Sequence, residues 1–224
     1  YESARRTINH VFESAAKRPK INTAEKVMES ITANTFNRTV PTIPNQKDRE
    51  AIFRKKSGRL SQPRHMAKLI NYGLSDIMLR YPNTLVFGED VAQKGGVYNV
   101  TADLYNQFGI RRVFNSPLDE TSIIGSAIGF AHNGFVPIPE IQFLAYFHNA
   151  EDQLRGEAST LSFFSEGQFM NPMVLRVPGL AYQKGFGGHF HNDNSLAVFR
   201  DIPGVILACP SNGPDAVKML RTAV

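Results

Sequence analysis

From residue 64 onward, short apolar segments alternate with longer helical ones, and this alternation limits what the chain can fold into. The apolar segments are 84–87, 111–114, 136–141, 172–177 and 204–208, and the helical ones are 65–81, 101–108, 119–133, 148–164 and a last one from about 212. Apolar strands that are separated by helices pair in parallel, and helices cover both faces of the sheet. We therefore predict an α/β fold with a mostly parallel, twisted sheet between two layers of helices.

The first 63 residues differ from this pattern and are predicted to be an N-terminal helical segment and linker, followed by a domain over 64–224. Apolar residues at helical spacing predict one or two short helices within 1–31, and three prolines with many polar residues predict a linker over 32–63. The chain begins with Tyr1 and ends at Val224 without a helix stop signal. We expect it to be a piece of a longer polypeptide, with 1–63 coming from an upstream region.

The charge is divided unevenly along the chain. Residues 1–65 carry a net charge of +8 and residues 66–224 a net charge of −3. The basic residues are scattered without interleaved aromatic residues, so we read them as a solvated surface and predict no nucleic-acid partner. No apolar run is long enough to span a bilayer, and we predict no membrane partner. The single cysteine, Cys209, suits a reducing compartment such as the bacterial cytoplasm.

Polar and glycine-rich residues gather directly after the predicted strands. They are 88–90, Asp119-Glu120, Gln142 to Tyr146, Pro178 to His191, and 210–212. In open parallel sheets, ligands bind beyond the carboxyl ends of the strands. The sequence therefore predicts a ligand site at this edge.

Asp119 and Glu120 stand at the junction between a strand and a helix, and two readings are open. Acidic residues in a first helical turn are favoured by the helix dipole and by unpaired N–H groups, a role that suits Asp119. Glu120 precedes Gly125, Ala127 and Gly129, which allow close helix packing. A carboxyl group desolvated there would have a raised pKa and could share a proton.

Three other motifs have a structural reading, and two of them also have a functional one. The stretch 88–96 is a loop with a Gly95-Gly96 turn, and its glycine spacing fits no nucleotide-binding motif. His189 and His191 are either exposed loop residues or imidazoles placed for proton transfer, and no metal site is predicted because acidic and cysteine ligands at suitable spacing are lacking. Tyr146 either packs in the core or stacks on a planar ligand.

Several stretches together resemble one family over nearly all of residues 65–224. They are "LVFGEDVAQKGGVY", "RVFNSPLDETSIIGSAIGFAHNG", "PIPEIQFLAYFHNAEDQ" and "IPGVILACPSNGPDAVKML". The chain resembles the pyrimidine-binding, transketolase-like domain of the beta subunit of thiamine-diphosphate-dependent 2-oxo acid dehydrogenases. The resemblance implies an oxidoreductase component that decarboxylates a 2-oxo acid and transfers the acyl group to a lipoyl-bearing acyltransferase.

The resemblance also implies roles for individual residues. Glu120 corresponds to the glutamate that hydrogen-bonds N1′ of the cofactor's aminopyrimidine, and Tyr146 to the aromatic residue that stacks on this ring. Glu89 corresponds to an acid on a proton path between two active sites, and His191 to the histidine needed for acyl transfer. Gln142 is expected to line the same pocket.

This sequence departs from the family pattern in ways that affect function. The family's His-Ser-Gln is replaced by His191-Asn192-Asp193, and the Gly-Asp-Gly segment that holds the diphosphate through Mg²⁺ is absent from the 224 residues. We therefore expect an alpha-like diphosphate-binding domain as partner, a homo-oligomeric parent enzyme, and no activity in this chain alone. The alternatives are a transketolase-like or deoxyxylulose-phosphate-synthase-like thiamine enzyme and a non-catalytic assembly or regulatory domain.

Overall fold

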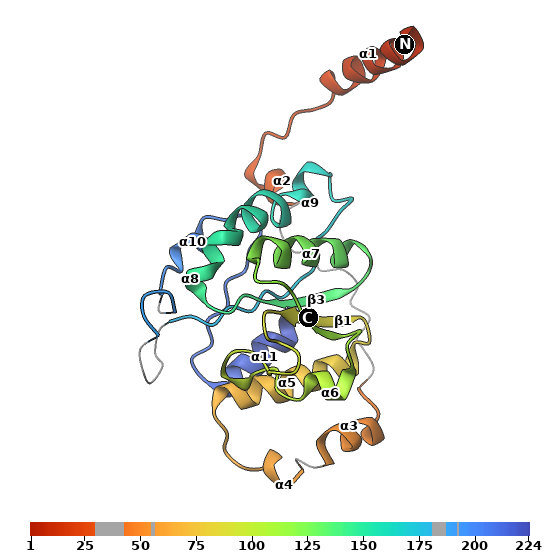
Figure 1. Ribbon diagram of the computed structural model, residues 1–224. Coiled ribbons are helices and arrows are strands. Elements are labelled where there is room, and N and C mark those ends of the chain that lie inside the picture. The colour runs from red at the N-terminus through yellow and green to blue at the C-terminus, as the bar shows by residue number, and fades with distance from the viewer. Residues whose placement is uncertain (30–42, 55–56, 181–186, 192) are drawn as a thin grey trace.

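A computed structural model describes residues 1–29, 43–54, 57–180, 187–191 and 193–224. Its described residues contain a three-stranded parallel sheet, which confirms the α/β class (Figure 1). The strands are β1 (Thr84–Gly88), β2 (Val113–Asn115) and β3 (Val136–Glu140), and β1 lies between the other two. Val86 of β1 pairs with Val113 of β2 and with Ile138 of β3.

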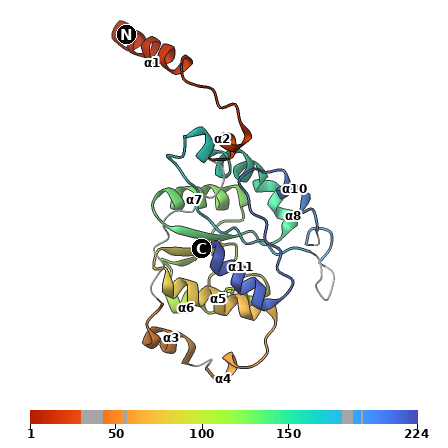
Figure 2. The ribbon, with the colours of Figure 1, turned by 180° about the vertical axis from the view of Figure 1, so that it is seen from behind.

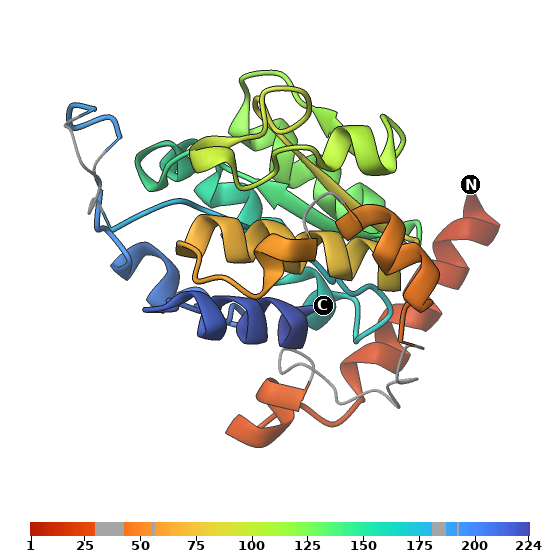
Figure 3. The ribbon, with the colours of Figure 1, turned by 90° about the horizontal axis from the view of Figure 1, so that it is seen from below.

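Side chains that alternate along β1 supply the two faces of the sheet with separate cores. Leu85 and Phe87 pack with α7 (Glu120–His132), while Val86 packs on the opposite face with α5 (Met66–Arg80) and α11 (Gly213–Ala223). The strand is fully buried, as expected for a parallel sheet that helices cover on both sides. Figure 2 shows α5 and α11 on one side of the sheet and α7 on the other, and Figure 3 shows α11 beside α5.

The predicted helices are found with small changes at their ends, apart from the segment 148–164. The described helical elements of the sheet region, besides α5, α7 and α11, are η2 (Val97–Asn99), α6 (Leu104–Phe108), α8 (Leu144–Phe147), η3 (His148–Ala150), η4 (Gln153–Ala158), α9 (Leu161–Phe164) and α10 (Ala197–Arg200). The segment 148–164 is thus broken into a 3-10 turn, a π-helical turn and a short α-helix. A π-turn inserted in a helix is often found at a functional site.

Two predicted strands differ from the structure. Residues 174–176 run beside β3, and Val174 N donates to Pro137 O and Arg176 N to Pro139 O, but only an isolated bridge from Arg176 to Glu140 results. Residues 204–208 form no strand, and Ile206 in that segment is 84% exposed. Apolar, β-branched composition predicted a strand here, but a strand needs a partner, and this segment has none among the described residues.

The N-terminal region contains the two predicted helices, α1 (Glu2–Ala16) and α2 (Ala24–Glu29), and neither has a buried residue. The predicted linker differs from expectation, because its described part holds α3 (Gln46–Phe53) and α4 (Ser57–Leu60). Asn45 caps α3 by accepting from Lys47 N, and Phe53 is buried against α5, where its ring meets that of Tyr72 edge-on. In the part of the chain that the structure describes, no helix has the length and hydropathy to cross a membrane.

Candidate active site

Two carboxyl groups meet where β1 and α7 come together. Glu89 directly follows β1 and is only 3% exposed, and Glu120 is the half-buried first residue of α7. Burial, then the negative charges of Glu120 and Asp90, then a hydrogen bond to Glu120, raise the pKa of Glu89 from 4.5 to about 7. Glu89 Oε1 is buried and has no hydrogen-bond partner among the described residues. The pair can therefore hold a proton near neutral pH and has an acceptor atom to spare.

The start of α7 directs Glu120 toward the segment that follows β3. Asn149 Nδ2 donates to Glu120 Oε2 over 3.3 Å, and Thr121 Oγ1 donates to the Asn149 carbonyl over 2.9 Å. Asp119 is the N-cap residue, but its side chain caps no backbone N–H and instead accepts from Ser122 Oγ. Asp119 thus occupies the predicted capping position but makes no capping hydrogen bond. The side chain of Glu120 faces Glu89 instead.

The raised pKa of Glu89 predicts a pH-dependent stability. A carboxyl whose pKa is higher in the folded than in the unfolded state stabilises the fold at low pH, and this contribution is lost as pH rises from about 4.5 to about 7. We expect Glu89→Gln to gain roughly 1–2 kcal/mol in free energy of unfolding, relative to the unsubstituted protein, between pH 5 and pH 8. Urea unfolding at both pH values measures it, and parallel profiles for the two proteins would contradict it.

A second pair of predicted residues, Tyr146 and His191, is also in contact. The Tyr146 hydroxyl lies 3.1 Å from His191 Nε2, and His191 Nδ1 lies 2.5 Å from the Gly187 carbonyl. Because a carbonyl only accepts, Nδ1 carries the proton in the neutral ring and Nε2 accepts from the tyrosine. The ring of Phe143 also meets His191 edge-on, with centroids 4.6 Å apart. His191 is therefore held in one tautomer by groups on both sides.

The two pairs come from neighbouring elements, and Gln142 belongs to neither. Asn149, which bonds Glu120, lies three residues after Tyr146 in the chain. Gln142 is half-buried just after β3 and has no hydrogen bond to the residues that the structure describes. The structure thus brings four of the five predicted residues into two contacts and leaves Gln142 without an assigned contact.

Sequence reasoning missed a buried ion pair at the end of β3. Glu140 at the end of β3 is fully buried, and its Oε2 lies 2.5 Å from Nη1 of Arg176. The other oxygen of Glu140 accepts from Val97 N over 3.4 Å. A Cβ at Gly96 (φ 67°) would come within 2.7 Å of Thr101 Oγ1, which explains the glycine in this turn. Glu140 is the last residue of β3, whereas Glu89 follows β1, and an acid inside an apolar segment was not read as a site signal.

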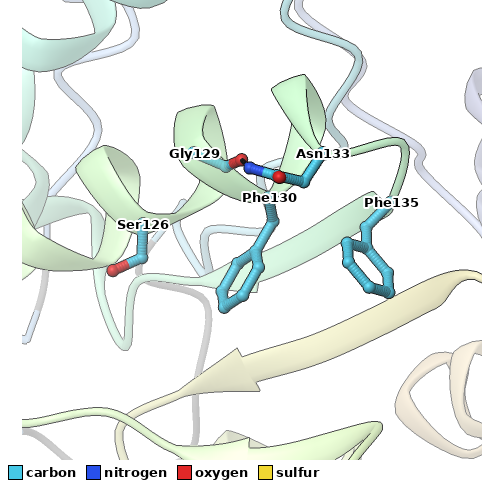
Figure 4. Close-up of a pocket in the computed structure, with 5 residues that line it drawn as sticks. All are labelled: Ser126, Gly129, Phe130, Asn133 and Phe135. Atoms are coloured by element: carbon cyan, nitrogen blue, oxygen red, sulfur yellow. Dashed lines mark hydrogen bonds between the residues drawn. The ribbon is translucent and has the colours of Figure 1, made fainter.

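The small residues of α7 do not pack as predicted. A Cβ added at Gly125 or Gly129 would meet no atom within 4 Å, and both glycines are exposed, whereas Ala127 is fully buried. Figure 4 shows Gly129 beside an open depression of about 380 Å³ that Ser126, Phe130, Asn133 and Phe135 also line. This depression holds no charged side chain and lies along α7 away from Glu120, so we place the chemistry at the carboxyl pair instead.

The remaining candidate residues from the sequence are not part of the two contacts. Among the residues with described positions, no group of three His, Cys, Asp or Glu side chains is arranged to hold a metal ion. His189 is exposed and packs its ring against Phe190. Asn212 caps α11 by accepting from Asp215 N. Residues 181–186 of the predicted histidine loop lie outside the described residues.

Comparison with known proteins identifies the family of the chain. The family described as "Transketolase, pyrimidine binding domain" matches residues 62–224. The 3-methyl-2-oxobutanoate dehydrogenase subunit beta of Mycobacterium tuberculosis is 37% identical over 74% of this chain and 47% of its own length. The 2-oxoisovalerate dehydrogenase subunit beta of Pseudomonas aeruginosa is 40% identical over 66% of this chain and 42% of its own length.

A third relative carries the name of a different 2-oxo acid. The pyruvate dehydrogenase E1 component subunit beta of Acholeplasma laidlawii is 38% identical over 71% of this chain and 48% of its own length. The chain thus spans about half the length of the curated relatives that it matches. With the family match covering most of the chain, the protein belongs to the transketolase pyrimidine-binding domain family, and its relatives are beta subunits of 2-oxo acid dehydrogenases.

Proposed function

We propose that this chain supplies the aminopyrimidine half of a thiamine diphosphate site in the decarboxylase component of a 2-oxo acid dehydrogenase. The observation that carries the proposal is the contact between Glu120 and the buried Glu89, whose pKa is raised to about 7. A carboxyl pair that retains a proton near neutral pH can hydrogen-bond a weakly basic ring nitrogen and share that proton with it.

The residues present fit the aminopyrimidine. Glu120 would hold the proton at N1′ of the ring. In the neighbouring carboxyl group, Glu89 Oε1 is a buried acceptor that has no hydrogen-bond partner among the described residues. Tyr146 would stack on the ring, and Gln142 would line its edge. When bound, thiamine diphosphate supplies the electron sink for loss of CO₂ from the 2-oxo acid. In this tautomer Nε2 of His191 carries no proton and accepts from Tyr146, and it would exchange a proton with the acyl acceptor during transfer to a lipoyl group.

The diphosphate and Mg²⁺ require groups that the 224 residues do not contain, since no Gly-Asp-Gly segment occurs among them. We propose that an alpha-like domain supplies these groups, that the working enzyme is oligomeric, and that a lipoyl-bearing acyltransferase accepts the product. The names of the relatives, which are called beta subunits, support a partner subunit. Whether the partner is a separate subunit or part of the same polypeptide does not change the chemistry proposed for Glu120.

Reconstitution tests the proposal. The 224-residue chain with Mg²⁺ and thiamine diphosphate is expected to release no CO₂ from pyruvate or from 3-methyl-2-oxobutanoate, and the complete enzyme is expected to release it from at least one of them. Release of CO₂ by the chain alone would refute the proposal that it supplies only half of the cofactor site. A complete enzyme that acts on sugar phosphates and on neither 2-oxo acid would favour the transketolase-like alternative, and one that acts on none of these would favour an assembly role.

A further inference from the structure

A second contact joins the segment that carries His191 to the segment that carries Tyr146. His148 Nε2 lies 3.2 Å from Asp193 Oδ2, and the Asp193 carboxylate is 18% exposed. His148 follows Tyr146 by two residues, and Asp193 follows His191 by two residues. The contacts Tyr146–His191 and His148–Asp193 therefore join the same two segments of the chain at two points.

Asp193 is itself rigidly held. Its Oδ1 accepts from Ser195 N over 2.8 Å and from Ser195 Oγ over 2.5 Å. The Ser195 hydroxyl is the largest cause that lowers the pKa of Asp193 below its usual 3.8, and burial opposes this while His148 supports it. With the oxygen and nitrogen of its amide exchanged, Asn194 would donate to Asp193 O over 2.9 Å and to Leu180 O over 3.2 Å. The Asp193 carboxylate is thus ionised at neutral pH and held in place two residues after His191.

His148 fits the role of donor to this carboxylate. An ionised carboxylate only accepts, so His148 Nε2 carries a proton. On the other side of the ring, Nδ1 lies 3.9 Å from Glu151 Oε2. The imidazole therefore stands between two acids, and Asp193 receives its shorter contact.

We propose that His148 and Asp193 are a positioning pair that holds His191 against Tyr146. The role of His191 in acyl transfer, on which this rests, belongs to the function proposed above. When the His148–Asp193 contact is formed, His191 and Tyr146 are held near each other. The hydrogen bond between them then forms at a high effective concentration. Loss of the His148–Asp193 contact would displace His191, and a displacement of about 1 Å can lower the rate of a chemical step by up to ~10²-fold.

A double-substitution cycle in the complete enzyme tests the pair. We expect His148→Ala and Asp193→Ala each to lower acyl transfer to the lipoyl acceptor about tenfold, and the double variant to be no slower than either. Decarboxylation measured with an artificial electron acceptor should change less than threefold. His148→Gln keeps an N–H donor near the position of Nε2 and should retain most of the transfer rate. Additive losses, or equal losses in both assays, would overturn the pairing.

A spectroscopic readout separates this inference from the proposed function. The ¹⁵N chemical shifts of the His191 ring report its tautomer and can be recorded on the 224-residue chain without any substrate. Asp193→Ala should shift the His191 Nε2 signal, while His132→Ala, an exposed histidine that bonds Asn171, should not. An unchanged Nε2 signal in Asp193→Ala would refute the positioning pair. A shifted signal with unchanged acyl transfer would refute the assigned role of His191 and leave the pair standing.

Discussion

Glu120→Gln is expected to lower turnover of the 2-oxo acid by the complete enzyme by about 10²- to 10⁴-fold. Glutamine keeps an oxygen that accepts from Asn149 Nδ2, so α7 and its contact with η3 should persist. What it removes is the acidic proton that the carboxyl pair shares and that Glu120 would hold at the ring nitrogen. The measurement is the initial rate of CO₂ release at saturating thiamine diphosphate.

The neighbouring carboxylate provides the matched control. Asp119 is exposed, lies one residue before Glu120 and accepts from Ser122 Oγ. Asp119→Asn changes the local charge by the same amount and should leave turnover within about threefold, since its exposed side chain bonds Ser122 and an exposed polar substitution is usually close to neutral. Equal losses in the two variants would mean that general charge near α7, and no specific proton, governs the rate.

Arg176→Met is expected to lower the free energy of unfolding by about 3–5 kcal/mol at pH 7. Arg176 is the ion-pair partner of Glu140, which is fully buried. Without the guanidinium, Glu140 would be a buried and uncompensated carboxylate, retaining a long hydrogen bond from Val97 N. Urea unfolding at pH 7, followed by circular dichroism, measures the loss.

The double variant Glu140→Gln, Arg176→Met distinguishes an unpaired charge from lost packing. Replacing both partners by neutral groups removes the buried charge, so the double variant should regain much of the stability that Arg176→Met loses. If the double variant is no more stable than Arg176→Met, the packing of the Arg176 side chain is the main contribution and the charge is not.

The alternation of apolar and helical segments predicted the parallel sheet and the helices around it, because such strands must be buried on both faces. The same reasoning failed at 204–208, where composition predicted a strand but pairing depends on a neighbour far away in sequence. It also failed at 148–164, where a regular helical period hid a break, and at α3, where Asn45 and Phe53 were ordinary residues in a polar stretch.

The candidate site could be predicted only in part for a similar reason. Strand ends indicated Glu89, Glu120 and Tyr146 one by one, since each follows directly from chain order. The contact between Glu89 and Glu120 depends on the approach of α7 to β1. The contact between His148 and Asp193 joins residues that are 45 positions apart in the chain. Such partners are fixed by tertiary structure, and a single sequence carries no direct signal for them.

The burial of Glu89 makes its ionisation sensitive to its surroundings at neutral pH, where an ordinary carboxylate stays ionised. A solvated glutamate is already fully ionised at neutral pH, so a small change in proton concentration leaves it unaffected. A group with a pKa of about 7 stands at the steepest part of its titration curve there. Any cation or dipole that arrives beside it can therefore change its ionisation, which gives this edge of the sheet a built-in response to whatever binds.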